Sequence, residues 1–422
     1  MRVLIVGGGG REHAIAWKLR QSSRLKELYC APGNAGIAQL ASIVPLKDSD
    51  IDGITSFAVE KRIDLVVVGP EAPLAAGLVD ELQKRGVAAF GPSRQAAMIE
   101  SSKSFAKRIM SRAGIATADA ERFADVGDAL EFLNRKSLPV VIKADGLAAG
   151  KGVVVAETRE EAERAIRSML QERIHGSAGS RILIEDYLQG KEVSVLGITD
   201  GKRIRVLAPA RDHKRVFDHD RGPNTGGMGA FSPVPGLPDG FAEQVRRTVL
   251  QPAVDALAEE GSPFRGVLYA GLMLTEEGPK VLEFNARFGD PETQVILPLL
   301  QEDLLDLMQS AAEGNLAERN QPGGENSRAA VSVVLASGGY PGSYLTGLPI
   351  SGLGELEQQD DIVVFHAGTK LHDGGFVTAG GRVLNVVAWD SDLAAARDKV
   401  YQAVQQIHFK GAHYRTDIAQ FV

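Results

Sequence analysis

The sequence predicts a multidomain α/β and α+β protein with a parallel α/β domain at its N-terminus. Its 422 residues correspond to about three ordinary domains of roughly 150 residues each. Strand-like apolar runs alternate with helical stretches up to about residue 100, which is typical of a parallel sheet. Two further groups of strands follow, separated by a polar segment near residue 320. We therefore expect domains over residues 1–102, 103–317 and 326–422.

The N-terminal domain opens with a predicted strand, glycine turn and helix. An apolar run from Val3 to Val6 meets the four glycines Gly7 to Gly10, and the following stretch Arg11–Arg20 suits a helix. The runs Ile63–Val68 and Val87–Phe90 predict two more buried strands, and both end at Gly-Pro. The repeated order of strand, turn and helix indicates a parallel sheet.

The middle of the chain contains a second group of strands around a long glycine-rich segment. Ser101–Gly114 looks helical and marks the boundary with the first domain. The segment 212–238 is dense in Gly, Pro, Asn and Asp without a sustained period, so we expect a long ordered loop of the kind that is usually functional. The other predictions are strands at Pro139–Lys143, Arg181–Ile184, Val267–Leu274 and Lys280–Phe284 and helices near 158–172 and 291–314.

The C-terminal part is expected to be an α+β domain. It follows a predicted linker at Glu318–Arg328. Strands are predicted at Ala329–Ala336, Ile362–Ala367 and Val383–Ala388, and a last helix runs from about Ser391 to Ile407.

Composition argues against several classes of function. A net charge of −7 and a sequence pI of about 5.7 provide no basic surface of the kind that nucleic-acid backbones require. The single cysteine, Cys30, rules out an intramolecular disulfide and a Cys-built zinc site, and it fits a reducing compartment. The N-terminal apolar run is too short for a signal peptide or a membrane span. We expect a cytoplasmic monomer without nucleic-acid or membrane partners.

The tetraglycine turn does not match a dinucleotide-binding fingerprint. The pattern G-x-G-x-x-G counted from Gly7 needs glycine at Glu12, and counted from Gly8 it needs glycine at His13. Backbone amides at the start of a helix can nevertheless hold a phosphate. We therefore expect a phosphate contact in this turn, with a purely structural role as the alternative.

The segment Val141–Gly152 carries the strongest local signal for nucleotide binding. It resembles a P-loop only superficially, because its glycine spacing is one residue too short and Gly152 stands where a magnesium-binding Ser or Thr would be needed. What remains is a strand lysine, Lys143, followed by a flap of small residues with a second lysine, Lys151. Two such cations could meet a triphosphate from two sides. Two surface lysines beside a flexible turn are the alternative.

Acidic residues follow the strand predicted at Arg181–Ile184. They are Glu185 and Asp186, with Glu192 further along the chain. An adenine ring needs an apolar slot with backbone hydrogen bonds at a strand edge, and a ribose needs a carboxylate. The segment could offer both, although acidic residues after strands are mostly solvated.

The run Val281–Thr293 is the sharpest cluster of chemical groups. Residues two apart in a strand share a face, so Glu283, Asn285 and Arg287 are expected to point the same way. Mg²⁺ favours a few carboxylate or carbonyl oxygens and takes its other ligands from phosphates and water. Glu283 and Asn285 are therefore a candidate magnesium site, with an exposed amphipathic strand as the alternative.

Together, these motifs resemble the ATP-grasp superfamily and, within it, the glycinamide ribonucleotide synthetases. The resemblance covers essentially the whole chain, and its most specific parts are Gly222–Gly229 and Glu283–Thr293. The other matching segments are Gly9–Ala14, Ala31–Gly36, Gly69–Leu74, Lys143–Gly152, Asp212–Arg215 and His366–Lys370.

The resemblance implies a pre-ATP-grasp domain, an ATP-grasp domain with a mobile lid at about 122–190, and a C-terminal domain. ATP would lie between the lid and the central domain. Its phosphates would meet Lys103, Lys143 and Lys151, its adenine Glu185 and the backbone from Asp186, and its ribose Glu192. Glu283 and Asn285 would hold Mg²⁺ or Mn²⁺.

The reaction that the resemblance implies is an ATP-dependent carboxylate–amine ligation in purine biosynthesis. Glycine would form glycyl phosphate, and the amine of 5-phosphoribosylamine would attack it to give glycinamide ribonucleotide, ADP and phosphate. Positioning and charge neutralisation supply most of the catalysis in phosphoryl transfer, so no covalent enzyme intermediate is needed.

The resemblance and the residue types together suggest roles for the substrate site. We expect Arg287 to hold the glycine carboxylate or the transferring phosphate, and Asp212 to hold the glycine ammonium. The loops expected to hold the ribose phosphate of the amine contain Gly9, Gly10, Gly33, Asn34 and Glu71, and Gly226, Gly227, Pro291 and Glu292 complete the set.

The sequence departs from the family pattern at two places, and three other functions compete. Gly8 stands where relatives often have Asn, and Leu268–Leu274 lacks the acidic metal ligand that many ATP-grasp enzymes place there, which leaves the number of metal ions open. The competing functions are an ATP-grasp ligase that carboxylates or formylates a nucleotide, a dinucleotide oxidoreductase, and a non-catalytic nucleotide-binding module. The loops at Asp212 and Gly226 argue against the first, and Glu12 argues against the second.

Overall fold

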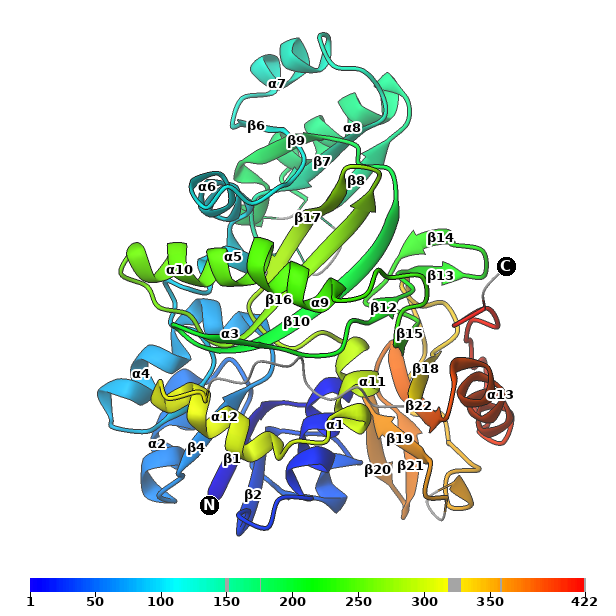
Figure 1. Cartoon of the computed structure of the whole chain (residues 1–422). Coiled ribbons are helices and arrows are strands. Elements are labelled where there is room, and N and C mark those ends of the chain that lie inside the picture. The colour runs from blue at the N-terminus through cyan, green and yellow to red at the C-terminus, as the bar shows by residue number, and fades with distance from the viewer. Residues whose placement is uncertain (149–151, 175, 318–327, 357–358, 421–422) are drawn as a thin grey trace.

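The computed structural model describes residues 1–148, 152–174, 176–317, 328–356 and 359–420. The described strands form four larger sheets and two small hairpins (Figure 1). The lid lies above the central sheet in Figure 1, while the N-terminal and C-terminal domains lie side by side below it.

A parallel sheet with the order β3-β2-β1-β4-β5 forms the N-terminal domain, which confirms the predicted parallel α/β fold. All four residues of β4 are buried, as expected for a strand covered on both faces by helices. The strands are β1 (Arg2–Gly7), β2 (Glu27–Pro32), β3 (Ser42–Ile43), β4 (Leu65–Val68) and β5 (Ala89–Phe90). The helices are α1 (Gly10–Leu19), α2 (Ile51–Glu60), α3 (Glu71–Ala76) and α4 (Leu78–Lys84), with a 3-10 turn at Ile37–Gln39.

The boundary with the second domain contains the helix that the sequence predicted and a shorter helix before it that the sequence did not predict. They are α5 (Met98–Ser101) and α6 (Lys103–Arg112). Ser102 is extended between them, and its side chain accepts a hydrogen bond from the N–H of Phe105. This serine caps the start of α6, which confirms the helix predicted at Ser101–Gly114 with bounds two residues shorter at each end.

The lid is an antiparallel sheet with the order β6-β9-β7-β8 and its own apolar core. Its strands are β6 (Ala120–Phe123), β7 (Val140–Ala144), β8 (Val153–Ala156) and β9 (Ile182–Asp186). Two helices, α7 (Val126–Leu133) and α8 (Arg159–Leu170), pack on it, and a 3-10 turn spans Gly176–Ser180. This unit falls close to the lid expected at about 122–190.

The central sheet is antiparallel and has the order β11-β10-β16-β17. The sequence predicted the last two strands but missed β10, which pairs with β16 over ten residues. The strands are β10 (Lys191–Asp200), β11 (Ile204–Val206), β16 (Arg265–Thr275) and β17 (Gly278–Asn285). The helices are α9 (Phe241–Val245), α10 (Gln251–Glu259), α11 (Glu292–Leu299) and α12 (Leu304–Glu313), with a π-helical turn at Arg246–Leu250.

The C-terminal sheet, with the order β12-β15-β18-β22-β19, includes two strands from the middle of the chain. They are β12 (Arg211–Asp212) and β15 (Gly229–Ser232), and Figure 1 shows them in green beside the orange strands. The others are β18 (Ala329–Ala336), β19 (Ile362–His366) and β22 (Arg382–Asp390), with α13 (Leu393–Val404) packed against β18 and β22. Two hairpins, β13 (Arg215–Phe217) with β14 (Arg221–Asn224) and β20 (Thr369–His372) with β21 (Gly375–Thr378), complete the fold.

The prediction of a loop over the whole of 212–238 was therefore wrong. The segment contains strands of two to four residues, which are too short to produce a sequence period. Strand β15 of this segment pairs with β18, which lies about a hundred positions further along the chain, so only the tertiary structure reveals the pairing. The predicted linker lies almost wholly outside the described residues. None of the described helices has the length and apolar character to cross a lipid bilayer.

Candidate active site

Strand β7 of the lid directs Lys143 towards the central domain. Its Nζ lies 2.8 Å from Glu185 Oε2 and donates to the main-chain oxygen of Leu282 on β17 at 3.0 Å. Lys107 Nζ approaches the same carboxylate, at 3.5 Å from Oε1. Lys143 and Glu185 are both buried, so each needs an opposite charge to offset the cost of leaving water. The pair connects the lid to the strand that carries the predicted metal ligands.

Lys103 stands at the first position of α6, and Asp145 fixes that end of the helix. The Asp145 carboxylate accepts hydrogen bonds from the N–H and hydroxyl of Ser104, both at 2.7 Å, and its main-chain oxygen accepts from the N–H of Lys103 at 3.3 Å. The loop after Lys143 is thereby tied to the helix that carries Lys103. The second predicted loop cation, Lys151, lies outside the described residues.

Glu283, on β17, is surrounded by cations. Burial alone would raise the pKa of this carboxyl, but Lys214, Lys103, Lys143 and Arg287 together lower it below its ordinary value. The carboxylate is therefore held ionised, as a metal ligand must be. Asn285 lies two residues further along the same strand and so shares its face.

Arg287 is held between two carboxylates of the N-terminal part of the chain. Its Nε lies 3.3 Å from Glu71 Oε2, and its second terminal nitrogen lies 3.3 Å from Glu100 Oε1. Burial lowers the pKa of Arg287, but Glu100 and Glu71 more than offset this and raise it. Glu100 also accepts the N–H of Ala286 at 2.7 Å. The structure thus joins the predicted residues Arg287 and Glu71 and adds Glu100, which the sequence did not single out.

Asp212, at the end of β12, lies two residues before Lys214, for which the sequence predicted no role. Withdrawal from water raises the pKa of Asp212 to about 7, against the opposing effect of Lys214, and Glu292 and Glu192 raise it further. Lys214 Nζ donates to Glu192 Oε2 at 2.5 Å. Burial lowers the pKa of Lys214, but Asp212 and Glu192 raise it well above its ordinary value. The predicted ribose ligand Glu192 is thus tied to the strand of Asp212.

Glu292 opens α11 and is part of a buried hydrogen-bonded chain. The hydroxyl of Tyr269 donates to Glu292 Oε1 at 2.8 Å, and the hydroxyls of Ser194 and Tyr269 lie 2.7 Å apart. A carboxylate in the first turn of a helix is stabilised by the helix dipole. Ser194 and Tyr269 come from β10 and β16, so this chain fixes α11 on the central sheet.

The glycine-rich loop at Gly226 and Gly227 packs against the turn that contains Pro291. Gly227 has φ +107, and a Cβ there would lie 2.4 Å from Pro291 Cδ, so the close approach requires glycine. Arg382, on β22, donates to the main-chain oxygen of Gly226 at 2.6 Å and lies 3.2 Å from Asp290 Oδ1. The C-terminal domain thereby holds the two segments of this predicted substrate site together.

The tetraglycine turn is wrapped around a carboxylate of its own helix. Glu12 is buried, its Oε2 accepts the N–H of Gly9 at 2.7 Å, and its Oε1 lies 2.7 Å from Arg11 Nε. A methyl group at Gly69 would lie 2.0 Å from Glu12 Oε1. The amide of Gly9 is therefore already used, and a phosphate contact at Gly10 stays a prediction.

Asn34 and Asp186 use their side chains for contacts within the protein. The Asn34 amide donates to the main-chain oxygens of Gly8 and His366, at 2.9 and 2.8 Å, which joins the N-terminal and C-terminal domains. Asp186 pairs with Lys136 at 2.5 Å on an exposed side of the lid. Since neighbouring strand residues point to opposite faces, Asp186 points away from the side that Glu185 occupies. The predicted contact between ATP and Asp186 would therefore use the main chain of Asp186 and not its side chain.

The predicted metal ligands suit a metal ion that takes most of its ligands from the bound substrate and water. Among the described residues no group of three or more His, Cys, Asp or Glu side chains is arranged to hold a metal ion. Mg²⁺ commonly takes one or two protein oxygens and completes its shell with phosphates and water. Glu283 and Asn285 fit that pattern.

Three models of the phosphoribosylglycinamide synthetase family match consecutive parts of the chain. The N domain matches residues 1–100, the ATP-grasp (A) domain 101–293 and the C domain 330–421. A phosphoribosylamine–glycine ligase of Caldanaerobacter subterraneus is 48% identical over 99% of both chains. A trifunctional purine biosynthetic protein adenosine-3 of Gallus gallus is 51% identical over 99% of this chain, which spans 42% of that protein.

Solved structures agree with these matches. A phosphoribosylamine–glycine ligase of Thermotoga maritima superposes with a TM-score of 0.86 and 34% identity, covering 99% of this chain and all of the other. The biotin carboxylase domain of the 2-oxoglutarate carboxylase of Hydrogenobacter thermophilus, solved with MgADP, reaches a TM-score of 0.78 at 17% identity over 98% of this chain and 91% of the other, which shows a shared fold. From its three matched domains and its full-length relatives, the chain belongs to the phosphoribosylglycinamide synthetase family of ATP-dependent ligases.

Proposed function

We propose that the chain acts as a phosphoribosylamine–glycine ligase, with Lys103, Lys143, Lys214 and Arg287 forming the cationic centre of the reaction. The observation that carries this proposal is that Lys143 contacts the main chain of Leu282, the neighbour of Glu283, and that the charges of all four residues lower the pKa of Glu283. Transfer of a phosphoryl group spreads negative charge over its oxygens, and fixed cations in a site shielded from water stabilise that charge. The family and the full-length relatives supply the substrates, glycine and 5-phosphoribosylamine.

The reaction has two steps. A glycine carboxylate oxygen attacks the γ-phosphorus of ATP, the bond to the bridging oxygen breaks, and glycyl phosphate and ADP form. The amine of 5-phosphoribosylamine then attacks the acyl carbon, loses a proton and displaces phosphate, which leaves glycinamide ribonucleotide. The enzyme forms no bond to either intermediate, so its residues act by binding, orienting and excluding water.

The ATP site is proposed between the lid and β17. The lid residue Lys143 reaches the main-chain oxygen of Leu282, so it lies at that boundary and is available to a phosphate there. Lys103, at the N-terminus of α6, is placed by Asp145 near the same point. Glu185 holds Lys143 and Lys107 in place, and the backbone that follows it is proposed to meet the adenine.

The metal site is proposed at Glu283 and Asn285. Mg²⁺ or Mn²⁺ bound there would neutralise phosphate charge. Glu283 holds its negative charge because of the four cations, and both side chains lie on one face of β17. The expected number of metal ions stays open.

The acceptor side is proposed around Asp212, Arg287 and the Gly226–Gly227 loop. Asp212 would hold the glycine ammonium, and Arg287 its carboxylate or the transferring phosphate. Glu71 and Glu100 on either side of Arg287 fix the direction of its guanidinium. The loops of Gly9, Gly10, Gly33 and Asn34 lie at the edge of the N-terminal sheet and are proposed to meet the phosphoribosyl group.

Phosphate release tests the proposal. The assay contains ATP, Mg²⁺, glycine and 5-phosphoribosylamine made in place from ribose 5-phosphate and ammonia, and each component is omitted in turn. Release that requires all four supports the ligase. Release that ignores glycine but responds to another carboxylate would replace the substrate, and ATP binding without any release would indicate a nucleotide-binding module. A monomeric state in the cytoplasm, without membrane partners, is proposed on composition alone.

A further inference from the structure

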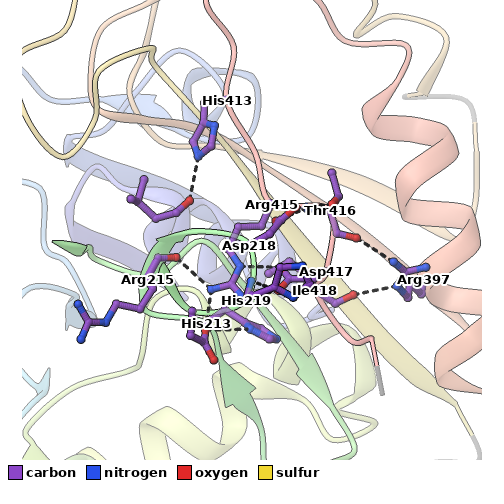
Figure 2. Close-up of polar contacts among 12 residues, drawn as sticks. His213, Arg215, Asp218, His219, Arg397, His413, Arg415, Thr416, Asp417 and Ile418 are labelled. Atoms are coloured by element: carbon purple, nitrogen blue, oxygen red, sulfur yellow. Dashed lines mark hydrogen bonds and ion pairs between the residues drawn. The ribbon is translucent and has the colours of Figure 1, made fainter. Parts of the chain in front are cut away.

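A short C-terminal segment, His413–Ile418, is bound to the β13–β14 hairpin by hydrogen bonds and ion pairs (Figure 2). Main-chain and side-chain groups on both sides take part. The contacts are His413 Nε2 with the oxygen of Val216 at 2.8 Å, the N–H of Thr416 to Asp218 at 2.8 Å, and the N–H of His219 to Asp417 at 2.8 Å. From α13, Arg397 donates to the main-chain oxygens of Thr416 and Ile418 and so holds the segment from behind.

Arg415 joins this segment to the hairpin through its guanidinium. Its side chain is 1% exposed, and its guanidinium binds both Asp417 oxygens at 2.7 Å, Asp220 Oδ1 at 2.8 Å and the main-chain oxygen of Arg215 at 3.1 Å. A buried guanidinium with two carboxylates and a carbonyl in this geometry is rigid, because its planar fork fixes all of them together. Two of its partners, Asp220 and Arg215, belong to the hairpin, so Arg415 fixes the hairpin relative to the C-terminal domain.

The hairpin tip needs such support. His219 and Asp220 have φ values of +58° and +50°, in the left-handed region that non-glycine residues enter only at a cost. Both residues are held from outside, His219 through its N–H to Asp417 and Asp220 through its carboxylate to Arg415. The contacts with the C-terminal segment therefore define the conformation of the tip.

Asp220 links Arg415 to His213, the residue that follows Asp212. The Nδ1 of His213 lies 3.9 Å from Asp220 Oδ1, and the His213 ring and the Arg415 guanidinium keep the pKa of Asp220 well below its ordinary value. The other ring nitrogen of His213 is buried and has no hydrogen-bond partner within the described part of the chain. Asp220 is thus a charged group within ion-pairing distance of this ring.

His213 lies between Asp212 and Lys214, in the two-residue connection between β12 and β13. Lys214 Nζ pairs with Glu192 at 2.5 Å, and the charge of Asp212 raises the pKa of Lys214. The main chain of His213 is bonded on both sides, its N–H to the main-chain oxygen of Gly229 and its oxygen to the N–H of Met228. Because His213 is joined covalently to both residues, a shift of His213 would also move Asp212 and Lys214.

We propose that Arg415, acting through Asp220 and His213, is a positioning residue for the ligase reaction that sets Asp212 and Lys214 against the glycine substrate. The inference rests on the proposed function, because it takes Asp212 as the group that meets glycine. It gives the C-terminal segment a part in catalysis through its contacts with the β13–β14 hairpin.

The test uses the full-length enzyme and two matched carboxylates of the hairpin. Asp220→Asn removes the charge that faces His213 and Arg415, while Asp218→Asn weakens a bond to Thr416 and leaves His213 untouched. Steady-state kcat and KM are measured with glycine varied and with ATP varied, and the melting temperature of each variant is recorded. Asp220→Glu keeps the charge and serves as the rescue variant.

The expected result separates positioning from simple support of the fold. Asp220→Asn should lower kcat/KM for glycine by roughly 10- to 100-fold with the KM for ATP unchanged, since small misplacements of orienting groups cost about that much. Asp220→Glu should restore most of the loss, and Asp218→Asn should match the wild type in both substrates. Equal kinetic effects of Asp218→Asn and Asp220→Asn, or wild-type kinetics of Asp220→Asn, would overturn the inference. A wild-type enzyme that releases no phosphate with glycine and 5-phosphoribosylamine would instead overturn the proposed function.

Discussion

The ammonium of Lys143 lies 2.8 Å from Glu185 Oε2, and the two residues are diagonal neighbours on the paired strands β7 and β9 of the lid. The same ammonium reaches across to the main chain of β17 at Leu282. A buried charge pair of this kind stabilises little by itself, because desolvation offsets most of the attraction. The pair instead holds a cation at the boundary between the lid and the central sheet, where the phosphates of ATP are proposed to bind.

Replacing this cation should weaken ATP binding. Lys143→Met is expected to raise the KM for ATP by roughly tenfold or more, because a hydrogen bond to a charged group contributes about 1.5–3 kcal/mol. The measurement is steady-state kinetics with ATP varied, supported by calorimetric titration with ADP. Lys136→Met is the matched control, because it breaks the exposed lid pair with Asp186. Unchanged ADP affinity in Lys143→Met would rule out the phosphate contact.

Removing the Glu283 carboxylate should abolish turnover and leave the fold intact. Glu283→Ala is expected to lower kcat by at least about 100-fold, in the range seen when one electrostatic group of a site is lost. Circular dichroism checks that the fold is kept. The melting temperature is expected to fall somewhat, because the lowered pKa means that the folded chain stabilises the Glu283 anion, and the substitution leaves the surrounding cations without it. Glu277→Ala, in the exposed turn before β17, is the control. Normal kcat in Glu283→Ala would refute the metal assignment.

The pH dependence of glycine use should follow Asp212. Its pKa is raised to about 7 by withdrawal from water, and only the anion can hold the glycine ammonium. The kcat/KM for glycine should therefore rise with pH up to about 7 and then level off. Asp212→Asn should remove this limb and lower kcat/KM, whereas Asp186→Asn should keep it.

Stability gives an independent check on the same group. Between the ordinary value of 3.8 and about 7, the folded chain retains a proton on Asp212 that the unfolded chain has lost. This residue therefore lowers the free energy of unfolding as pH rises through that window, and the effect is complete above it. Urea unfolding of the wild type and Asp212→Asn at pH 5 and pH 8 measures the difference. The variant should gain stability relative to the wild type at pH 8, and an equal difference at both pH values would contradict the raised pKa.

A methyl group at Gly69 should destabilise the N-terminal domain. It would collide with Glu12 Oε1 and displace a buried carboxylate from Arg11 and from the N–H of Gly9. Leaving such groups without partners costs about 1–3 kcal/mol, so Gly69→Ala should lower the melting temperature by several degrees. Gly354→Ala, where a Cβ meets nothing within 4 Å, is the control. Equal melting temperatures for the two variants would show that Glu12 can move at no cost.

Local sequence patterns predict the features that depend on neighbouring residues. The glycine turn after β1, the buried run of β4 and the alternation of Glu283 and Asn285 on β17 are all local patterns, and backbone geometry converts each into an element or a shared face. Buried strands such as β18 (Ala329–Ala336) were predicted with the bounds that the structure has. The family also follows from the sequence, because its motifs are short segments of fixed order.

The packing of the domains sets which side chains meet across long stretches of chain. Arg287 pairs with Glu71 across 216 positions, Lys214 pairs with Glu192 across 22 positions, and Arg415 meets Asp220 across 195 positions. Strands as short as β12 and β15 produce no period, and the pairing of β15 with β18 depends on how the domains pack. Charge pairs carry no sequence spacing of their own, because any lysine or glutamate can find a partner wherever the fold brings one. The residue types of the site were therefore predictable, while their partners were set by the packing of the domains.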